Sequence, residues 1–294
     1  MSQPLTGGFL NLDKPAGLTS RDVVNRVQRL VRPAKVGHAG TLDPLATGVL
    51  VVAVGAATRL IEFVQELPKE YRATFLLGRT SPTEDIEGEV VELPHAGVPA
   101  LADLIAATTR LTGTNLQRPP VFSALKVAGR RAYQLARRGE TPQLAPRPIT
   151  IDRFDVLRYE YPELETSIRC SSGTYVRSLG RDLAESLGTG AVMSALVRTA
   201  IGRFRLAGCC SLELLNAERI LDALLPMSRA VEHLPRQDLT DGEVIDVRHG
   251  KRIARQGFTG DAVYAAFDPR GTLVGTLTCK EPGFLWPERI LPSE

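Results

Sequence analysis

Cysteine and histidine are scarce in this chain, which has only four of each among its 294 residues. No two cysteines have the Cys-x-x-Cys spacing of a zinc or redox site, and no histidine lies at a ligand's spacing from one of them. We therefore expect no bound metal, and we interpret the adjacent pair Cys209–Cys210 as buried thiols. The cysteines are Cys170, Cys209, Cys210 and Cys279.

Long apolar runs are absent as well. None approaches the ~20 residues that a membrane-spanning helix needs. The N-terminal segment has no basic region followed by an apolar one, as a signal peptide would have. We therefore expect no membrane contact and a cytoplasmic location. Hydrophobic residues make up 43% of the chain, which is enough to bury a full core.

Charge of one sign is only slightly in excess, with a net charge of +3, which permits nucleic-acid binding without arguing for it. Basic residues do cluster in one segment, and a surface that follows a phosphate backbone needs such a cluster. A solvated helix face explains the cluster equally well at this stage. Its members are Lys126, Arg130, Arg131, Arg137, Arg138 and Arg147.

Strand-like and helix-like patterns interleave over residues 1–234, without the strict alternation of a parallel sheet. We therefore predict an α+β fold with a mixed or antiparallel sheet flanked by helices. From residue 237 to 294 the pattern changes to short strands separated by glycine turns, which indicates a small β-barrel-like second domain. The expected strands are 8–12, 49–54, 71–77, 149–159 and 164–171, and the expected helices are 20–31, 58–64, 98–111, 132–138 and 174–187.

The segment Gly37–Gly48 is the most unusual stretch of the chain, with glycines at 37, 40 and 48. Glycine allows backbone conformations that are closed to other residues, and Pro44 fixes the backbone beside Asp43. A short carboxylate on a rigid loop before a buried strand suits a nucleophile or a general base. An aspartate that merely closes a turn is the competing interpretation.

Several motifs in order along residues 8–234 resemble those of the bacterial tRNA pseudouridine-55 synthases, the TruB family. The loop Gly37–Gly48 is similar to the catalytic loop of that family. The other matching segments are Leu12–Ser20, Lys69–Ala73, Leu77–Gly88, Gln117–Lys126, Arg131–Tyr133 and Ser172–Leu179. The resemblance implies the pseudouridine synthase fold, followed by an RNA-binding module of the PUA type over 237–294.

The resemblance also assigns roles to single residues. It implies that Asp43 is the nucleophile, that Arg177 is its cationic partner and that Tyr71 stacks on the uracil. Burial raises the pKa of a carboxyl group, and a neighbouring guanidinium opposes that shift. The substrate-binding residues that it implies are Lys14, His38, Arg130, Arg131, Arg137, Arg138, Tyr175 and Leu196.

The implied substrate is the T arm of tRNA, whose target uridine has to be flipped out of a folded loop. Breaking and remaking one glycosidic bond oxidises nothing, so we expect no cofactor. We also expect a monomer. Two other hypotheses stay open at this point: a tRNA-binding or tRNA-folding protein without catalysis, and a guide-RNA-dependent relative with the same chemistry.

Overall fold

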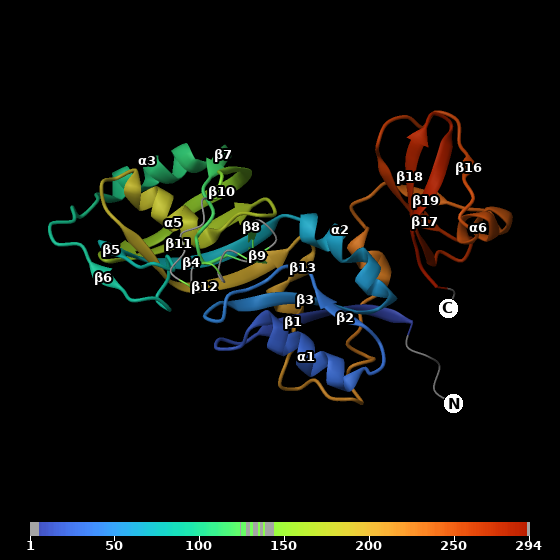
Figure 1. Cartoon of the computed structure of the whole chain (residues 1–294), viewed down its shortest axis with the longest axis horizontal. Helices are drawn as coiled ribbons and strands as arrows, with labels where there is room; N and C mark the ends of the chain where they lie inside the picture. The colour runs from blue at the N-terminus through green and yellow to red at the C-terminus, as the bar shows by residue number, and fades with distance from the viewer. Residues whose placement is uncertain are drawn as a thin grey trace.

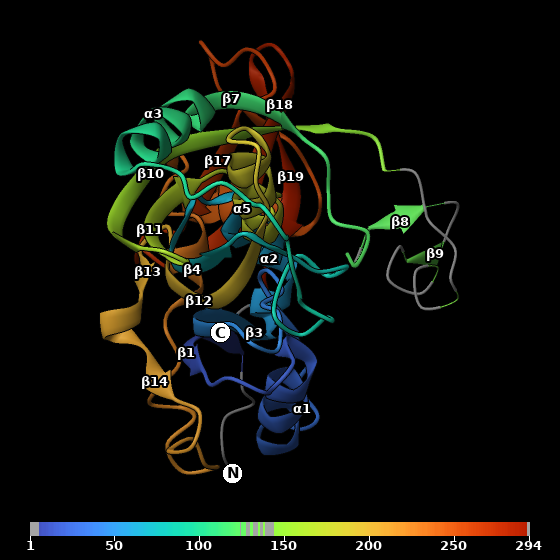
Figure 2. The ribbon, with the colours of Figure 1, turned by 90° about the vertical axis from the view of Figure 1, so that its left-hand side faces the viewer.

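The computed structural model describes residues 6–123, 125–127, 130–131, 135, 138 and 144–292. A ten-stranded mixed sheet forms the larger part and a five-stranded sheet the smaller, C-terminal part (Figures 1 and 2). The large sheet runs β14-β1-β3-β12-β4-β11-β10-β7, with β2 added to β3 and β13 added to β12. This arrangement confirms the predicted α+β class with a mixed sheet.

The strands of the large sheet are β1 Gly7–Lys14, β2 Val36–His38, β3 Thr47–Gly55, β4 Lys69–Leu77, β7 Gly113–Gln117, β10 Arg147–Glu160, β11 Glu163–Cys170, β12 Ala191–Ile201, β13 Phe204–Arg205 and β14 Cys210–Ser211. Two small ribbons are β5 Arg79–Thr80 with β6 Val91–Glu92, and β8 Lys126–Val127 with β9 Arg130–Arg131. The helices are α1 Ser20–Leu30, α2 Ile61–Glu66, α3 Leu101–Leu111, α5 Val176–Glu185 and α6 Asp241–Arg248, with 3-10 turns η1 Ala56–Leu60, η2 Leu206–Gly208 and η3 Met227–Ala230.

Local sequence explains the elements around the future site. Strand β3 is buried from Gly48 to Val54 because both of its faces are covered, and a continuous apolar run is what such a strand requires. Helix α1 begins after Thr19, whose hydroxyl accepts from the Asp22 amide while the Asp22 carboxylate accepts from the Thr19 amide. This capping box fixes the start of the helix that was expected over 20–31.

Strand β12 is the structural centre that the sequence analysis missed. It pairs in parallel with β3 and antiparallel with β4, so it joins the two halves of the large sheet. The short strand β2 lies in a segment that we expected to be a loop. The expected helix over 132–138 lies largely outside the described residues.

The C-terminal sheet has the order β15-β17-β18-β19-β16, with strands β15 Arg236–Asp238, β16 Ile253–Ala254, β17 Val263–Phe267, β18 Leu273–Glu281 and β19 Phe284–Ile290. It does not stand apart from the large sheet. Ala265 and Leu273 belong to the same apolar cluster as Phe63 of α2 and Met227 of η3. The two sheets therefore share part of one core. Among the described helices, none has the length and apolarity that crossing a membrane requires.

Candidate active site

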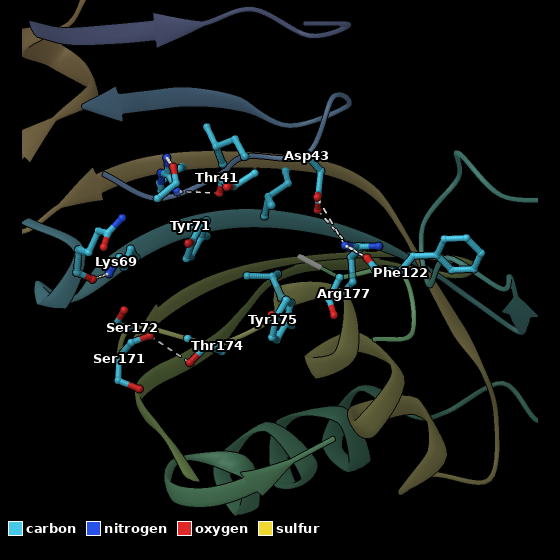
Figure 3. A pocket seen from close by; sticks show the side chains of 18 residues that line it. Thr41, Asp43, Lys69, Tyr71, Phe122, Ser171, Ser172, Thr174, Tyr175 and Arg177 are labelled. Carbon is cyan, nitrogen blue, oxygen red and sulfur yellow. Dashed lines mark hydrogen bonds and ion pairs between the residues drawn. The ribbon is translucent and has the colours of Figure 1, made fainter. Parts of the chain in front are cut away.

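A cavity of about 340 Å³ lies beside β4 and β12, on the face of the large sheet where α5 begins (Figure 3). Its wall combines segments that are far apart in the chain: the loop before β3, the start of β4, the loop between β11 and α5, and the middle of β12. The lining residues used below are Asp43, Lys69, Tyr71, Ser171, Ser172, Thr174, Tyr175, Arg177, Leu196 and Arg198.

Lys14 holds the loop that carries Asp43. Its Nζ donates to the carbonyls of Pro15 at 2.9 Å, Leu18 at 2.7 Å and Pro44 at 3.2 Å. Burial lowers the pKa of Lys14, and the charge of Asp43 opposes this shift. The residue is 0% exposed. The buried ammonium therefore positions the loop through its backbone carbonyls, and the substrate-binding role expected for Lys14 stays a prediction.

Arg198 of β12 holds the same loop from its other side. The guanidinium donates to the carbonyls of Val49 at 2.7 Å, Gly40 at 3.0 Å and Thr41 at 3.3 Å. At Gly48 the backbone has φ +95°, and a Cβ there would lie 2.3 Å from the carbonyl oxygen of Arg198. Only glycine allows this approach, so the loop and β12 form one rigid unit.

Arg177, in the first turn of α5, grips the Asp43 carboxylate with two nitrogens (Figure 3). Its Nε lies 3.1 Å from Oδ2, and its Nη2 lies 3.4 Å from Oδ1. The guanidinium also donates to the carbonyls of Thr83 at 2.7 Å and Phe122 at 3.1 Å. Its planar fork is thus fixed on both edges, and it can present the carboxylate in one orientation.

Asp85 is a second carboxylate on the same guanidinium. Its Oδ2 lies 3.3 Å from Nη1 of Arg177, and its side chain is 2% exposed. The Thr83 hydroxyl donates to Asp85 Oδ1 at 2.5 Å. Asp43 therefore shares the charge of Arg177 with a neighbour that is more deeply buried.

Opposing effects set the ionisation of Asp43. Burial raises the pKa of this carboxyl group above its ordinary value, and the charge of Arg177 opposes the rise. Asp85 raises the pKa further, whereas Lys14 and Arg198 lower it. The balance leaves the pKa of Asp43 raised, so the cations offset desolvation only in part.

Tyr71 and Leu196 form the apolar wall of the cavity, from adjacent strands β4 and β12. They are 8% and 6% exposed. Arg198 is the direct cross-strand neighbour of Tyr71. Burial raises the pKa of the Tyr71 phenol, and the charge of Arg198 opposes this shift. Tyr175 lines the same cavity, and its amide donates to the side chain of Gln117 at 2.8 Å.

Of the other expected RNA contacts, His38 and Arg138 are not among the described residues that line this cavity. His38 is in β2, where its Nδ1 is buried without a hydrogen-bond partner among the described residues. Arg130 and Arg131 form strand β9 of a small ribbon, and Arg138 is exposed. Arg137 lies outside the described residues.

Three residues of this region had no role predicted from the sequence: Lys69, Asp85 and Arg198. Lys69 and Asp85 lie within matching segments, and Arg198 lies two residues after Leu196. No pattern in the sequence says that Asp85 meets Arg177, or that Arg198 meets the loop at Gly40, because tertiary packing makes both contacts. The described residues contain no group of three or more His, Cys, Asp or Glu side chains that could hold a metal ion.

Solved structures share this architecture. The chain is similar to one in a crystal structure of a Cbf5–Nop10–Gar1 complex, with a TM-score of 0.74 and 29% identity, covering 94% of this chain and 79% of that one. It also resembles a chain in a structure of an H/ACA RNP bound to a substrate RNA containing 2′-deoxyuridine, with a TM-score of 0.74 and 26% identity, covering 97% and 85%. Fold and site together define the class of protein as a pseudouridine synthase.

Family models narrow the class further. The N-terminal domain of the TruB family pseudouridylate synthases matches residues 28–176, the C-terminal domain of tRNA pseudouridylate synthase B matches 177–232, and the C-terminal model of tRNA pseudouridine synthase II matches 234–283. A tRNA pseudouridine synthase B of Mycobacterium tuberculosis (strain H37Rv) is 44% identical over 92% of this chain and 91% of its own length. One of Arthrobacter sp. (strain FB24) is 44% identical over 93% of both. The chain belongs to the TruB family, which confirms the family and the isomerase class predicted from the sequence.

Proposed function

We propose that this enzyme isomerises the T-loop uridine of tRNA, position 55, to pseudouridine, with Asp43 as the nucleophile. The observation that carries the proposal is the two-nitrogen grip of Arg177 on Asp43 at the wall of a cavity of about 340 Å³. Cavities of this size enclose one small ligand. A single flipped nucleoside fits that description, and a paired base does not.

The reaction needs a nucleophile, a holder for the detached base and a way to remove one proton. The N1–C1′ bond breaks, the uracil turns, a C5–C1′ bond forms and the C5 proton moves to N1 through a base or water. Asp43 attacks either the ribose or the base, and both routes require its ionised form. The ring of Tyr71 and the side chain of Leu196 hold the uracil while it is detached.

Arg177 and the fixed loop supply the positioning that this chemistry needs. Only a carboxylate held in one orientation presents its oxygen to the same substrate atom at each turnover. The mutual grip also favours the ionised form against the effect of burial. The other expected RNA contacts, at His38 and at Arg130, Arg131, Arg137 and Arg138, remain part of the proposal.

The first prediction is that Asp43→Asn abolishes pseudouridine formation while tRNA affinity changes by less than about threefold. Asparagine keeps the shape of the side chain and removes the nucleophile. Pseudouridine formation and affinity are measured side by side on an unmodified tRNA transcript. Residual activity within about tenfold of the wild type removes Asp43 from this role.

The same assay decides between the competing functions. The enzyme acts on the bare transcript, without guide RNA or partner protein, if it is a stand-alone synthase. Activity only in the presence of a guide RNA supports the guide-dependent alternative, and binding without product supports a folding factor. We also expect a cytoplasmic monomer, and a mass measurement by light scattering tests the oligomeric state.

A further inference from the structure

Cations outnumber anions in the wall of the cavity. Among the described residues, the charged side chains of the lining are the cations Lys69, Arg177 and Arg198 and one anion, Asp43. Arg177 is matched by Asp43 and by Asp85. The remaining two cations have no carboxylate in contact within the described part of the chain, although both are buried. A buried charge without a counter-charge is costly, so these cations favour an anionic group in the cavity.

Of these two cations, Lys69 and Arg198, it is Lys69 that has hydrogen-bond donors available for a ligand. The guanidinium of Arg198 already donates to backbone carbonyls, those of Gly40 and Thr41 in the catalytic loop and that of Val49 in β3. Lys69 is 6% exposed, and its Nζ donates to one carbonyl, that of Gln65. An ammonium group has three donors, so two remain. Burial and the charge of Arg198 lower the pKa of Lys69 to about 8, a shift that an anion in the cavity would oppose.

A loop rich in hydroxyl groups stands next to Lys69. Strand β11 pairs with β4 so that Cys170 lies opposite Lys69, and the loop 171–174 follows directly. Its hydroxyl-bearing residues Ser171, Ser172 and Thr174 line the cavity. Figure 3 shows Lys69 beside this loop at one end of the cavity, with Asp43 and Arg177 at the other and Tyr71 between them. The cavity thus has a chemical end and a cationic end.

We propose that the cationic end, formed by Lys69 and the loop 171–174, binds one backbone phosphate of the RNA next to the isomerised nucleotide. The inference rests on the proposed function, because it takes the substrate to be RNA. An ammonium group with neighbouring hydroxyls is a common phosphate-binding set. A uracil carbonyl is neutral and leaves the buried charge uncompensated. A phosphate held here fixes the ribose from its far side while Asp43 acts on the nucleotide.

The test combines a protein variant with an RNA variant. Lys69→Met keeps the apolar stem and removes the charge. Arg72→Met is the matched control, because Arg72 is exposed on the same strand and faces away from the cavity. The RNA is a T-arm stem-loop with a neutral methylphosphonate at the phosphate either 5′ or 3′ to the target uridine. Affinity, single-turnover rate with saturating enzyme, and melting temperature are measured for each protein.

For the wild type, we expect one of the two neutral linkages to weaken binding on the order of tenfold, the effect of one charged hydrogen bond. Lys69→Met should bind unmodified RNA about tenfold more weakly and show no further loss with that linkage. Its rate at saturation should fall as well, because the ribose is then no longer fixed from its far side while Asp43 acts. Its melting temperature should not fall, because removing an uncompensated buried charge does not destabilise a fold. Arg72→Met should behave as wild type throughout.

Two results overturn the inference. In the first, each neutral linkage weakens RNA binding by Lys69→Met as much as it weakens binding by the wild type. The ammonium group then contacts neither phosphate. In the other, the saturated rate or the melting temperature falls and the affinity does not, so Lys69 acts on the base or supports the fold. A wild type that forms no pseudouridine in any RNA refutes the proposed function instead, which separates the two failures.

Discussion

Arg177 is the residue whose replacement tests the electrostatic design most directly. Arg177→Met keeps most of the apolar stem and removes the charge that contacts Asp43. Burial already raises the pKa of Asp43, and Arg177 is the strongest influence that opposes it. Without it, the pKa of Asp43 rises further. The acid limb of the single-turnover pH profile therefore moves to higher pH, because only the ionised carboxylate reacts.

The structure sets the size of the effect. Unit charges about 4 Å apart interact by about 4 kcal/mol at the effective dielectric constant of a partly exposed site. The Asp43 side chain is 33% exposed, and Arg177 divides its charge with Asp85. We discount the interaction for solvent screening to about 2 kcal/mol. Since ~1.4 kcal/mol is a factor of ten, the rate on the acid side should fall roughly 30-fold.

The sign of the pH dependence distinguishes this role from a grip on RNA. Raising the pH should close part of the deficit of Arg177→Met, the part that comes from the raised pKa of Asp43, while the wild type reaches its plateau at lower pH. Arg177→Lys should be intermediate, since lysine keeps the charge without the planar fork. Arg158→Met, an exposed arginine of β10 that pairs with Glu160, is the control. An unshifted acid limb with weaker RNA binding alone would mean that Arg177 holds phosphate and that other groups keep Asp43 ionised.

Two further perturbations have signs that follow from the contacts. Asp85→Asn removes a carboxylate that raises the pKa of Asp43, so the acid limb should move to lower pH in the same assay. A limb that moves upward would show that Asp85 acts mainly by positioning Arg177. Deleting residues 237–294 should lower the melting temperature of the remainder, because Phe63 and Met227 lose part of their apolar cover, and full exposure of such a side chain costs about 1.5–3 kcal/mol. An unchanged melting temperature would contradict the shared core.

Periodicity within single segments was enough to predict much of the architecture. The strands expected over 71–77 and 49–54 correspond to β4 and β3, and the helix expected over 20–31 corresponds to α1. Strand β12 carries the sequence Ala191–Ile201, in which Ser194 and Arg198 interrupt the apolar residues. Polar side chains inside a central strand break the hydrophobic pattern by which a strand is recognised in a sequence. Arg198 is tolerated in this strand because its guanidinium donates to carbonyls of the catalytic loop.

Some residues of the site could be predicted from the sequence, and others are seen only in the structure. Asp43, Tyr71 and Arg177 came from motifs that resemble a known family, and the structure brings all three to one cavity. Asp85 was not assigned in advance, because the resemblance gave no role to it within the matching segment Leu77–Gly88, and its contact with Arg177 is seen only in the structure. The resemblance placed Lys14 among the substrate-binding residues, and nothing in the sequence indicates that its side chain is buried beneath the loop that carries Asp43.

A buried carboxylate that acts as a nucleophile has to stay ionised. It therefore needs nearby positive charge, and that charge must not be neutralised by another anion. This site meets that need with cations bound to carbonyl oxygens: Lys14 to those of Pro15, Leu18 and Pro44, and Arg198 to those of the loop. Carbonyl dipoles fix a cation in place without cancelling its charge, whereas a carboxylate would do both. The field of Lys14 and Arg198 therefore reaches Asp43 and lowers its pKa. The same excess of positive charge extends along the cavity to Lys69, where an anionic group of the substrate is its natural complement.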